Sequence, residues 1–290
     1  MKNKLAFLQF IKERFPIHIL TFTTLSTVFA SASITTNVFN YWQVIVAFVI
    51  TTLFLFHIRA IDERRDFIND SEFHPERPIQ QGIISIKKLL TFSVLGIILS
   101  LVLALFSSTS TFVISLIFLV FTTFAAFDFF IPTFFKNRPV LYHIINSPQM
   151  ILLQWLIFSI FSSSFDMTFE MFLFMFLIYI NIFILELVRK INSPDNDTSD
   201  TYSANLGLKK SIAFLIFLVF LSFIFYTIII RATGTFPVFN FLFFGALLCL
   251  FVIAVFLYFY FKPRNSFKKK MELSAVILYV FMNLLIYLAK

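Results

Sequence analysis

Residues 86–106 read IKKLLTFSVLGIILSLVLALF, an apolar run that is interrupted only by two lysines near its start. A run of about 20 such residues is long enough to cross the hydrocarbon core of a bilayer as a helix. Eight further runs of this kind occur along the 290 residues. The nine predicted spans are about Phe15–Ile34, Val38–Ile58, Ile86–Phe106, Thr111–Phe130, Val140–Phe161, Phe169–Val188, Leu208–Ile230, Phe236–Phe261 and Met271–Ala289.

The composition agrees with the spans. Hydrophobic residues make up 59% of the chain and charged residues only 13%, which is more apolar surface than a soluble core of this length can bury. The alternation of period two that is typical of a membrane barrel is absent, so the spans are expected to be helices. The sequence therefore predicts an all-α integral membrane protein with about nine transmembrane helices.

The basic residues predict the orientation of these helices. Of the 23 lysines and arginines, all but Arg231 and Lys290 fall on the side of the predicted spans that holds the N-terminus. The positive-inside rule then places the N-terminus and the long loops in the cytoplasm, and the protein in the cytoplasmic membrane. The net charge of +8 is thereby explained as a topology signal, so no nucleic-acid partner is expected, and no protein partner is predicted. Cys249 is the only cysteine, which excludes disulfides and thiolate metal sites.

A charged island precedes this apolar run. Residues Asp62–Gly82 read DERRDFINDSEFHPERPIQQG, and Asp62, Asp66 and Asp70 recur every four residues. On a helix these three carboxylates would share one face. They repel one another unless a cation lies among them, and the usual cations are a hard divalent metal or Arg and Lys side chains. The island is therefore the strongest indication of function in the sequence.

The segment His74-Pro75-Glu76-Arg77-Pro78 follows the carboxylates. Because proline disfavours a helix, the acidic helix is expected to end near Phe73 and the chain to turn back, with Gly82 in the turn and Ser85 as N-cap of the third span. The turn would bring Arg77 towards the carboxylates, where it could neutralise an aspartate or grip a phosphate. The other interpretation is a solvated loop whose ion pairs only fix the topology.

A second polar loop, residues 189–210, follows the sixth predicted span. Asp195, Asp197 and Asp200 lie in it after Pro194, and oxygen ligands on a loop suit Mg²⁺. Aspartates also favour turns on their own, so this cluster is a weaker signal than the first.

Just before the second loop, Glu186 lies near the cytoplasmic end of the sixth span. A carboxylate is costly in lipid, so Glu186 is expected to face the bundle interior, either in a cavity or paired with Arg189 or Lys190. The helix–acidic loop–helix pattern thus occurs twice. It suggests that residues 1–290 form a single domain of two similar halves, about 15–135 and 138–290, around a shared site.

These motifs resemble the UbiA superfamily of intramembrane prenyltransferases. The first motif, DxxxDxxxD followed by xxRPxxxG, comes after the second of nine spans, and it resembles most the branch whose motif opens with Asp-Glu, here Asp62-Glu63. That branch has a second-loop pattern of R-K…P-x-x-D…T-Y-S…G. In this sequence the pattern is carried by Arg189-Lys190, Pro194, Asp197, Thr201-Tyr202-Ser203 and Gly207.

The resemblance implies a helical bundle with a cavity open to lipid. It implies binding of a polyprenyl diphosphate through Mg²⁺, and transfer of the prenyl group to a lipophilic acceptor such as an aromatic ring or a quinone precursor. Binding of Mg²⁺-diphosphate would fall to Asp62, Asp66 and Asp70, and the second metal cluster to Asp195, Asp197 and Asp200. Contact with phosphate is a conjecture for Arg77. The candidates for substrate binding are Glu186, Arg189, Lys190 and Tyr202.

One position departs from the family pattern. The usual second motif spaces its aspartates four apart, and the position of its first aspartate falls near Lys190 here. Either this branch binds its second metal differently, or Lys190 replaces a metal charge. Two alternatives to a prenyltransferase remain, a terpene cyclase on the same scaffold and a non-catalytic membrane protein that binds or transports isoprenoids.

Overall fold

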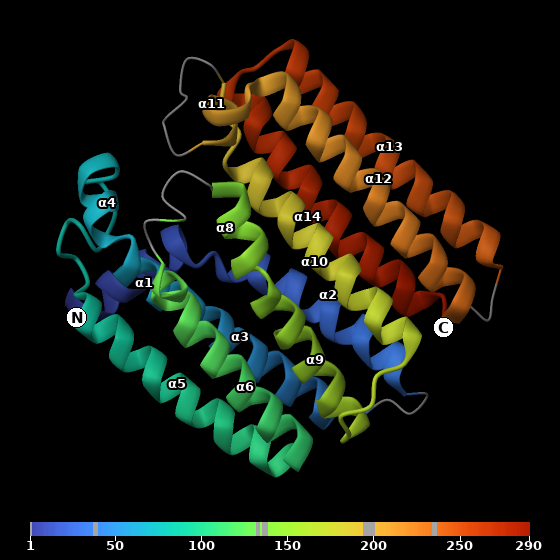
Figure 1. Cartoon of the computed structure of the whole chain (residues 1–290), viewed down its shortest axis with the longest axis horizontal. Coiled ribbons are helices and arrows are strands. Elements are labelled where there is room, and N and C mark those ends of the chain that lie inside the picture. The colour runs from blue at the N-terminus through green and yellow to red at the C-terminus, as the bar shows by residue number, and fades with distance from the viewer. Residues whose placement is uncertain (1, 37–39, 132–133, 135–138, 194–200, 234–236) are drawn as a thin grey trace. The chain divides into compact units, whose positions relative to one another are not determined.

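The computed structural model of the chain describes residues 2–36, 40–131, 134, 139–193, 201–233 and 237–290 (Figure 1). Every regular element among these residues is a helix. Nine helices of the described chain are long and apolar enough to cross a membrane. The predicted fold class is confirmed, and the protein is a multi-pass membrane protein.

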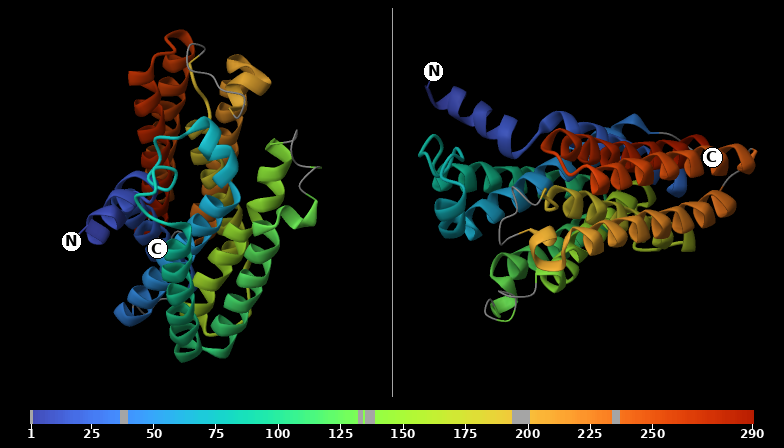
Figure 2. Two further views of the ribbon diagram at one scale, coloured as in Figure 1. Left: turned by 90° about the vertical axis from the view of Figure 1, so that its left-hand side faces the viewer. Right: turned by 90° about the horizontal axis from the view of Figure 1, so that it is seen from above.

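The helices fall into two compact units, the first made of Met1–Val28 and Asn40–Asp166, the second of Phe29–Phe39 and Met167–Lys290 (Figures 1 and 2). In the first unit α3 packs against α5 and α9, and α6 packs against the same two helices. Its elements are α1 (Lys2–Arg14), the start of α2 (Ile17–Thr35), α3 (Tyr41–Arg65), α4 (Phe67–Phe73), α5 (Ile86–Ser107), α6 (Thr109–Ala126), the 3₁₀ turn η1 (Asp128–Phe130), α8 (Pro139–Asn146) and α9 (Pro148–Ser162).

In the second unit α10 and α13 both pack against α12 and α14. Its elements are the end of α2, α10 (Phe169–Arg189), α11 (Tyr202–Leu206), α12 (Leu208–Thr233), α13 (Val238–Phe261) and α14 (Asn265–Leu288). The hydroxyl of Ser222 on α12 donates a hydrogen bond of 2.7 Å to the buried Asn181 side chain on α10. This bond satisfies two polar groups that would otherwise be costly inside a membrane bundle.

An apolar cluster holds the N-terminal helix and the acidic segment of the first unit together. It joins α1, α3, the loop after α4 and α5, and it contains Phe10, Phe15, Phe56, Ala60, Ile79, Ile84 and Leu89. The loop follows the prediction: α4 ends at Phe73, Gly82 has a φ of +69°, and the side chain of Ser85 accepts a hydrogen bond from the backbone of Lys88. The acidic segment is thus fixed to the bundle by a packed core.

Several predicted spans have different ends in the structure, and three of the differences have a clear physical cause. Helix α3 continues past Ile58 to Arg65, because its charged last turns are paired side chains rather than a solvated loop. Helix α6 ends at Ala126 instead of Phe130, since the backbone of residues 128–130 has positive φ. The fifth span is divided at Ser147, because Pro148 lacks the N–H that a continuous helix needs and instead begins α9.

Candidate functional site

The last turn of α3 places two of the predicted aspartates around one arginine. The guanidinium of Arg65 lies 3.1 Å from Asp62 Oδ1 and 2.9 Å from Asp66 Oδ1. Both carboxylates are accessible, with 28% and 44% of their side chains exposed. Arg65 therefore offsets part of the negative charge of an accessible carboxylate pair, as a bound cation would.

Asp70 lies in a different environment. The three aspartates do not share one continuous helix, because α3 ends at Arg65, α4 begins at Phe67, and Asp66 is the junction. Asp70 is buried, forms a close ion pair with Arg77, and has Arg14 Nη2 at 3.8 Å. The expected return of Arg77 to the acidic segment is confirmed, and it neutralises Asp70 rather than Asp62 or Asp66.

Sequence reasoning missed the most deeply buried charge of this segment, Glu63. Its side chain is fully buried and forms ion pairs with Arg59, one helical turn earlier, and with Arg14 Nε at 2.8 Å. Burial, and then the positive charge of Arg59, lower the pKa of Arg14. The i, i+4 spacing of Arg59 and Glu63 was a readable signal. The pairing of Arg14 with Glu63 could not be predicted from the sequence, since 49 positions separate the two residues.

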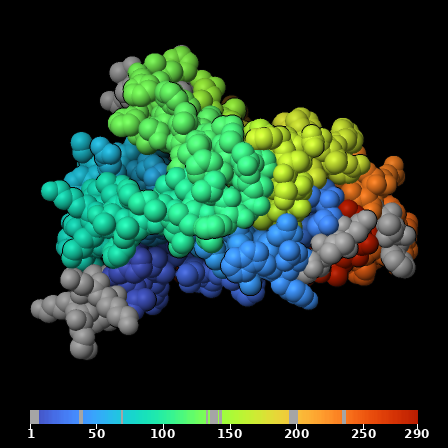
Figure 3. Space-filling model, turned by 90° about the horizontal axis from the view of Figure 1, so that it is seen from below, coloured from blue at the N-terminus to red at the C-terminus, as the bar shows by residue number. Residues whose placement is uncertain are grey.

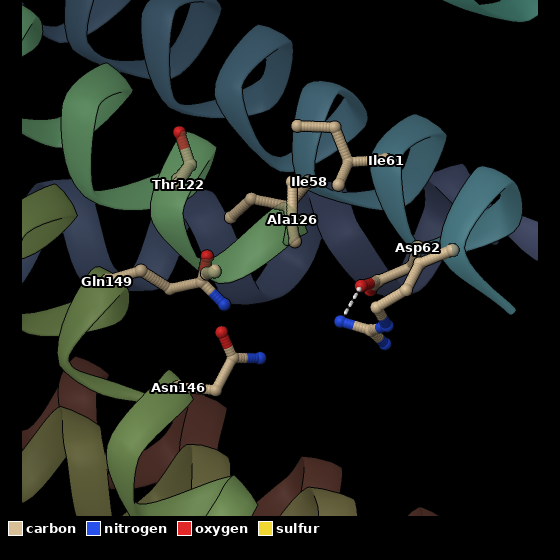
Figure 4. A pocket seen from close by; sticks show the side chains of 9 residues that line it. Ile58, Ile61, Asp62, Thr122, Ala126, Asn146 and Gln149 are labelled. Atoms are coloured by element: carbon tan, nitrogen blue, oxygen red, sulfur yellow. Dashed lines mark ion pairs between the residues drawn. The ribbon is translucent and has the colours of Figure 1, made fainter. Parts of the chain in front are cut away.

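A small recess in the first unit is lined by Asp62 and by polar side chains of α8 and α9 (Figure 4). The side chains of Asp62, Asn146 and Gln149 reach it from three helices, and Thr122 of α6 also lines it. The residues that line it are Ile58, Ile61, Asp62, Arg65, Thr122, Ala125, Ala126, Asn146 and Gln149. Neither amide was among the predicted site residues, because a lone Asn or Gln in an apolar span carries no motif.

The donor groups of this recess fit a hard divalent cation. Asp62 supplies carboxylate oxygens, and the amide oxygen of Asn146 is buried with no hydrogen-bond partner among the described residues. Carboxylate and amide oxygens are the ligands that Mg²⁺ and Ca²⁺ take, whereas thiolates and imidazoles are absent from the residues that line the recess. No group of three His, Cys, Asp or Glu side chains placed for a metal occurs in the described chain. A metal here would therefore combine the Asp62 carboxylate with amide, phosphate or water oxygens.

The predicted substrate-binding residues of the second unit lie together. Glu186, at the end of α10, accepts ion pairs from Arg189 Nη2 at 2.7 Å and Lys190 Nζ at 3.2 Å. Lys190 Nζ also lies 5.9 Å from the ring centre of Tyr202, and the backbone N–H of Tyr202 donates to the Lys190 carbonyl at 2.9 Å. The expected pairing of Glu186 is thus confirmed with both cations.

Tyr202 is buried against this cluster, with 2% of its surface exposed. Burial, and then the negative charge of Glu186, raise the pKa of its phenol. The phenol therefore stays protonated and can donate a hydrogen bond. Asp195, Asp197 and Asp200, the predicted second metal cluster, lie outside the described residues.

The sequence matches the model of a known family over residues 22–285, and that family is the UbiA prenyltransferase family. The match confirms the resemblance that the acidic motifs predicted. Among curated proteins no sequence matches.

Solved structures share the fold. The apo structure of a UbiA homologue from Aeropyrum pernix K1 has a TM-score of 0.69 at 14% identity, over 93% of this chain and 97% of that chain. A structure from work on the biosynthesis of digeranylgeranylglyceryl phosphate synthase in membranes has a TM-score of 0.64 at 19% identity, over 100% and 99%. A UbiA homologue from Archaeoglobus fulgidus, bound to GPP and Mg²⁺, has a TM-score of 0.54 at 13% identity, over 96% and 99%.

Proposed function

Because this chain belongs to the UbiA prenyltransferase family, we propose that it transfers the prenyl group of a polyprenyl diphosphate to a lipophilic acceptor within the membrane, with Mg²⁺ as cofactor. The acceptor is an aromatic compound or a quinone precursor. The observation that carries the proposal is the accessible pair Asp62 and Asp66, which shares Arg65. Asp62 also lines the recess, together with Asn146. The Archaeoglobus fulgidus homologue bound to GPP and Mg²⁺ supports the same class of substrate and cofactor.

Asp62 and Asp66 would hold the metal of the first motif, and Asp195, Asp197 and Asp200 that of the second. When bound, Mg²⁺ neutralises the negative charge that develops on the leaving diphosphate. The buried Asp70 remains a proposed member of the first motif, although its ion pairs with Arg77 and Arg14 favour a role in holding α4 in place.

Arg65 is the residue whose role must change on binding. In the structure its guanidinium forms ion pairs with the two carboxylates that a metal would take. If the two carboxylates held a metal, the guanidinium of Arg65 would bind the diphosphate oxygens at two points through its planar fork. Arg65 would therefore hold the leaving group, and would reduce the repulsion between the two carboxylates before substrate arrives.

Arg189 and Lys190 offer further positive charge to a diphosphate, and Glu186 orients both. Lys190 lies near the family position of an aspartate, so it would supply fixed charge where relatives of the usual pattern supply a metal ligand. Tyr202 holds the Lys190 backbone and lies beside its amine. We place these residues, the N-terminus and both acidic segments on the cytoplasmic side of the cytoplasmic membrane, on the evidence of the basic residues.

The test is diphosphate release by detergent-purified protein from geranyl, farnesyl, geranylgeranyl and longer polyprenyl diphosphates, with and without Mg²⁺. Asp66→Asn should lower release by roughly 10²–10³-fold, the size of effect seen when one charge-stabilising group is removed. The matched control is Asp166→Asn, which changes an exposed carboxylate outside the site and should leave release unchanged.

A membrane lipid extract is then added as a source of acceptor. Release that depends on the extract indicates transfer, whereas release with a cyclic hydrocarbon product and no need for the extract indicates a cyclase. No release from any substrate by folded protein would refute the catalytic proposal and leave an isoprenoid-binding role.

A further inference from the structure

Helix α3 has a second hollow, on the side away from the acidic recess. Thr52, Leu53 and Phe56 line it, whereas Ile58, Ile61, Asp62 and Arg65 line the recess. A helix turns by about 100° per residue, so these two sets of positions point in nearly opposite directions. The second hollow, called the α1–α5 groove below, is therefore separate from the proposed catalytic site.

The α1–α5 groove is a cavity of about 690 Å³ with an apolar lining. This volume falls within the roughly 300–1,000 Å³ of sites that bind small molecules. The residues that line it are Phe7, Ile11, Phe15, Thr52, Leu53, Phe56, Ile83, Ile84, Lys88 and Phe92. Phe7, Ile11 and Phe15 are spaced four residues apart. The side of α1 that carries Phe7 and Ile11, continued by Phe15, therefore forms one wall of this groove.

Aromatic contacts give the groove defined walls. The ring centre of Phe7 on α1 lies 6.3 Å from that of Phe56 on α3 and 5.2 Å from that of Phe92 on α5. Phe15 completes the wall, with its ring 5.5 Å from Phe56 and nearly perpendicular to it. Figure 3 shows the face of the molecule on which α1 and α5 lie side by side. Three elements thus build the groove, rather than one uncovered helix face.

Its single charged lining residue is Lys88, which is exposed and lies in the first turn of α5. The start of a helix carries a partial positive charge, which adds to the charge of Lys88. Thr52, Leu53, Phe56 and Phe92 belong to helices that are long and apolar enough to span the membrane, and Phe92 is exposed. The groove therefore combines an apolar channel at membrane depth with a cationic rim where α5 begins.

We propose that the α1–α5 groove binds one anionic glycerophospholipid of the leaflet that contacts the start of α5. An acyl chain lies between α1, α3 and α5, and the headgroup phosphate pairs with Lys88. Hydrocarbon is the solvent at this depth, so an acyl chain suits the apolar walls, and the amine at the rim selects a negatively charged headgroup. The lipid would fix α1 against α3 without entering the acidic recess.

The test is native mass spectrometry of the purified full chain with dioleoyl phosphatidylglycerol or dioleoyl phosphatidylcholine, which differ in headgroup charge but not in chains. We expect one phosphatidylglycerol bound in preference to phosphatidylcholine. Lys88→Glu should weaken its binding by about tenfold or more, because an attraction near the membrane surface becomes a repulsion. The matched control Lys87→Glu reverses an exposed charge that does not line the groove, and should weaken binding clearly less than Lys88→Glu does.

A second variant, Thr52→Phe, fills the channel while leaving the rim unchanged, and should remove binding of both lipids. Its fold is checked by circular dichroism and thermal unfolding. Equal binding of the two lipids, or equal losses in Lys87→Glu and Lys88→Glu, would overturn the proposal in favour of a non-specific lipid annulus. One-for-one displacement of phosphatidylglycerol by a prenyl diphosphate would also overturn it, and would assign the groove to substrate.

Discussion

The guanidinium of Arg14 lies 2.8 Å from the carboxylate of Glu63, a side chain with no exposed surface. Arg14 belongs to the N-terminal helix and Glu63 to the helix that carries the acidic motif, and Arg59 shares the same carboxylate. The motif is therefore held by a network of two partly buried arginines around the buried Glu63, whereas the side chains of Asp62 and Asp66 are more exposed.

Removing Glu63 should destabilise the protein severely. Glu63→Leu leaves Arg14 and Arg59 close together without their shared carboxylate, and breaking a buried pair in this way costs about 3–5 kcal/mol. Thermal unfolding in detergent checks this result. The exposed Glu72→Gln serves as control, and equal stability of the two variants would show that the buried network does not stabilise the fold.

Replacing Arg65 should separate metal binding from turnover. In Arg65→Gln the carboxylates of Asp62 and Asp66 lose their shared cation, so half-saturation should require less Mg²⁺. At the same time kcat for diphosphate release should fall by roughly 10–100-fold, because a charged contact to the leaving group is lost. Arg64→Gln, which changes the exposed neighbour, is the control. A lower kcat with unchanged Mg²⁺ dependence would contradict the shared-cation role.

Adding a methyl group at Gly245 should disrupt the packing of α12 on α13. A Cβ atom there would lie 2.4 Å from Cε1 of Tyr226, whose hydroxyl donates to the Phe241 carbonyl at 2.8 Å. Gly245→Ala should therefore lower the free energy of unfolding by about 1–3 kcal/mol. The double variant with Tyr226→Leu should lose less than the sum of the two single variants, since the clash is then removed. Additive losses would show that the ring and the glycine do not compete for space.

Stability should fall at alkaline pH partly through Tyr202. Burial raises the pKa of its phenol above the ordinary 10.0, so the folded state favours the protonated form. This contribution is fully present below pH 10 and is lost as pH rises beyond it, because the unfolded chain then releases the proton first. Tyr202→Phe should show a smaller loss of unfolding free energy between neutral and strongly alkaline pH. An identical pH dependence would exclude this role.

Local patterns predicted the spans and the turn after the acidic segment, because apolar length, proline and glycine act within a few residues. The end of α3 was predicted too early, since a hydropathy pattern treats Arg59 and Glu63 as water-exposed charges although they neutralise each other. The division of the fifth span was missed despite Pro148. Contacts between distant segments, such as Arg14 with Glu63 or Asn146 beside Asp62, follow from tertiary packing that no local pattern records.

The charged end of α3 also sets how deep the helix can lie in a bilayer. The last two turns of α3 contain Arg59, Glu63 and Arg65, while the preceding turns are apolar. Drawing this end into hydrocarbon by one turn would cost about 2.5–3.5 kcal/mol for each charged group that enters. When bilayer thickness changes, α3 should therefore keep its charged end at the interface and adjust by tilting or by moving its opposite end. Asp62 and Asp66 would then meet an incoming headgroup at the same level in thick and thin membranes.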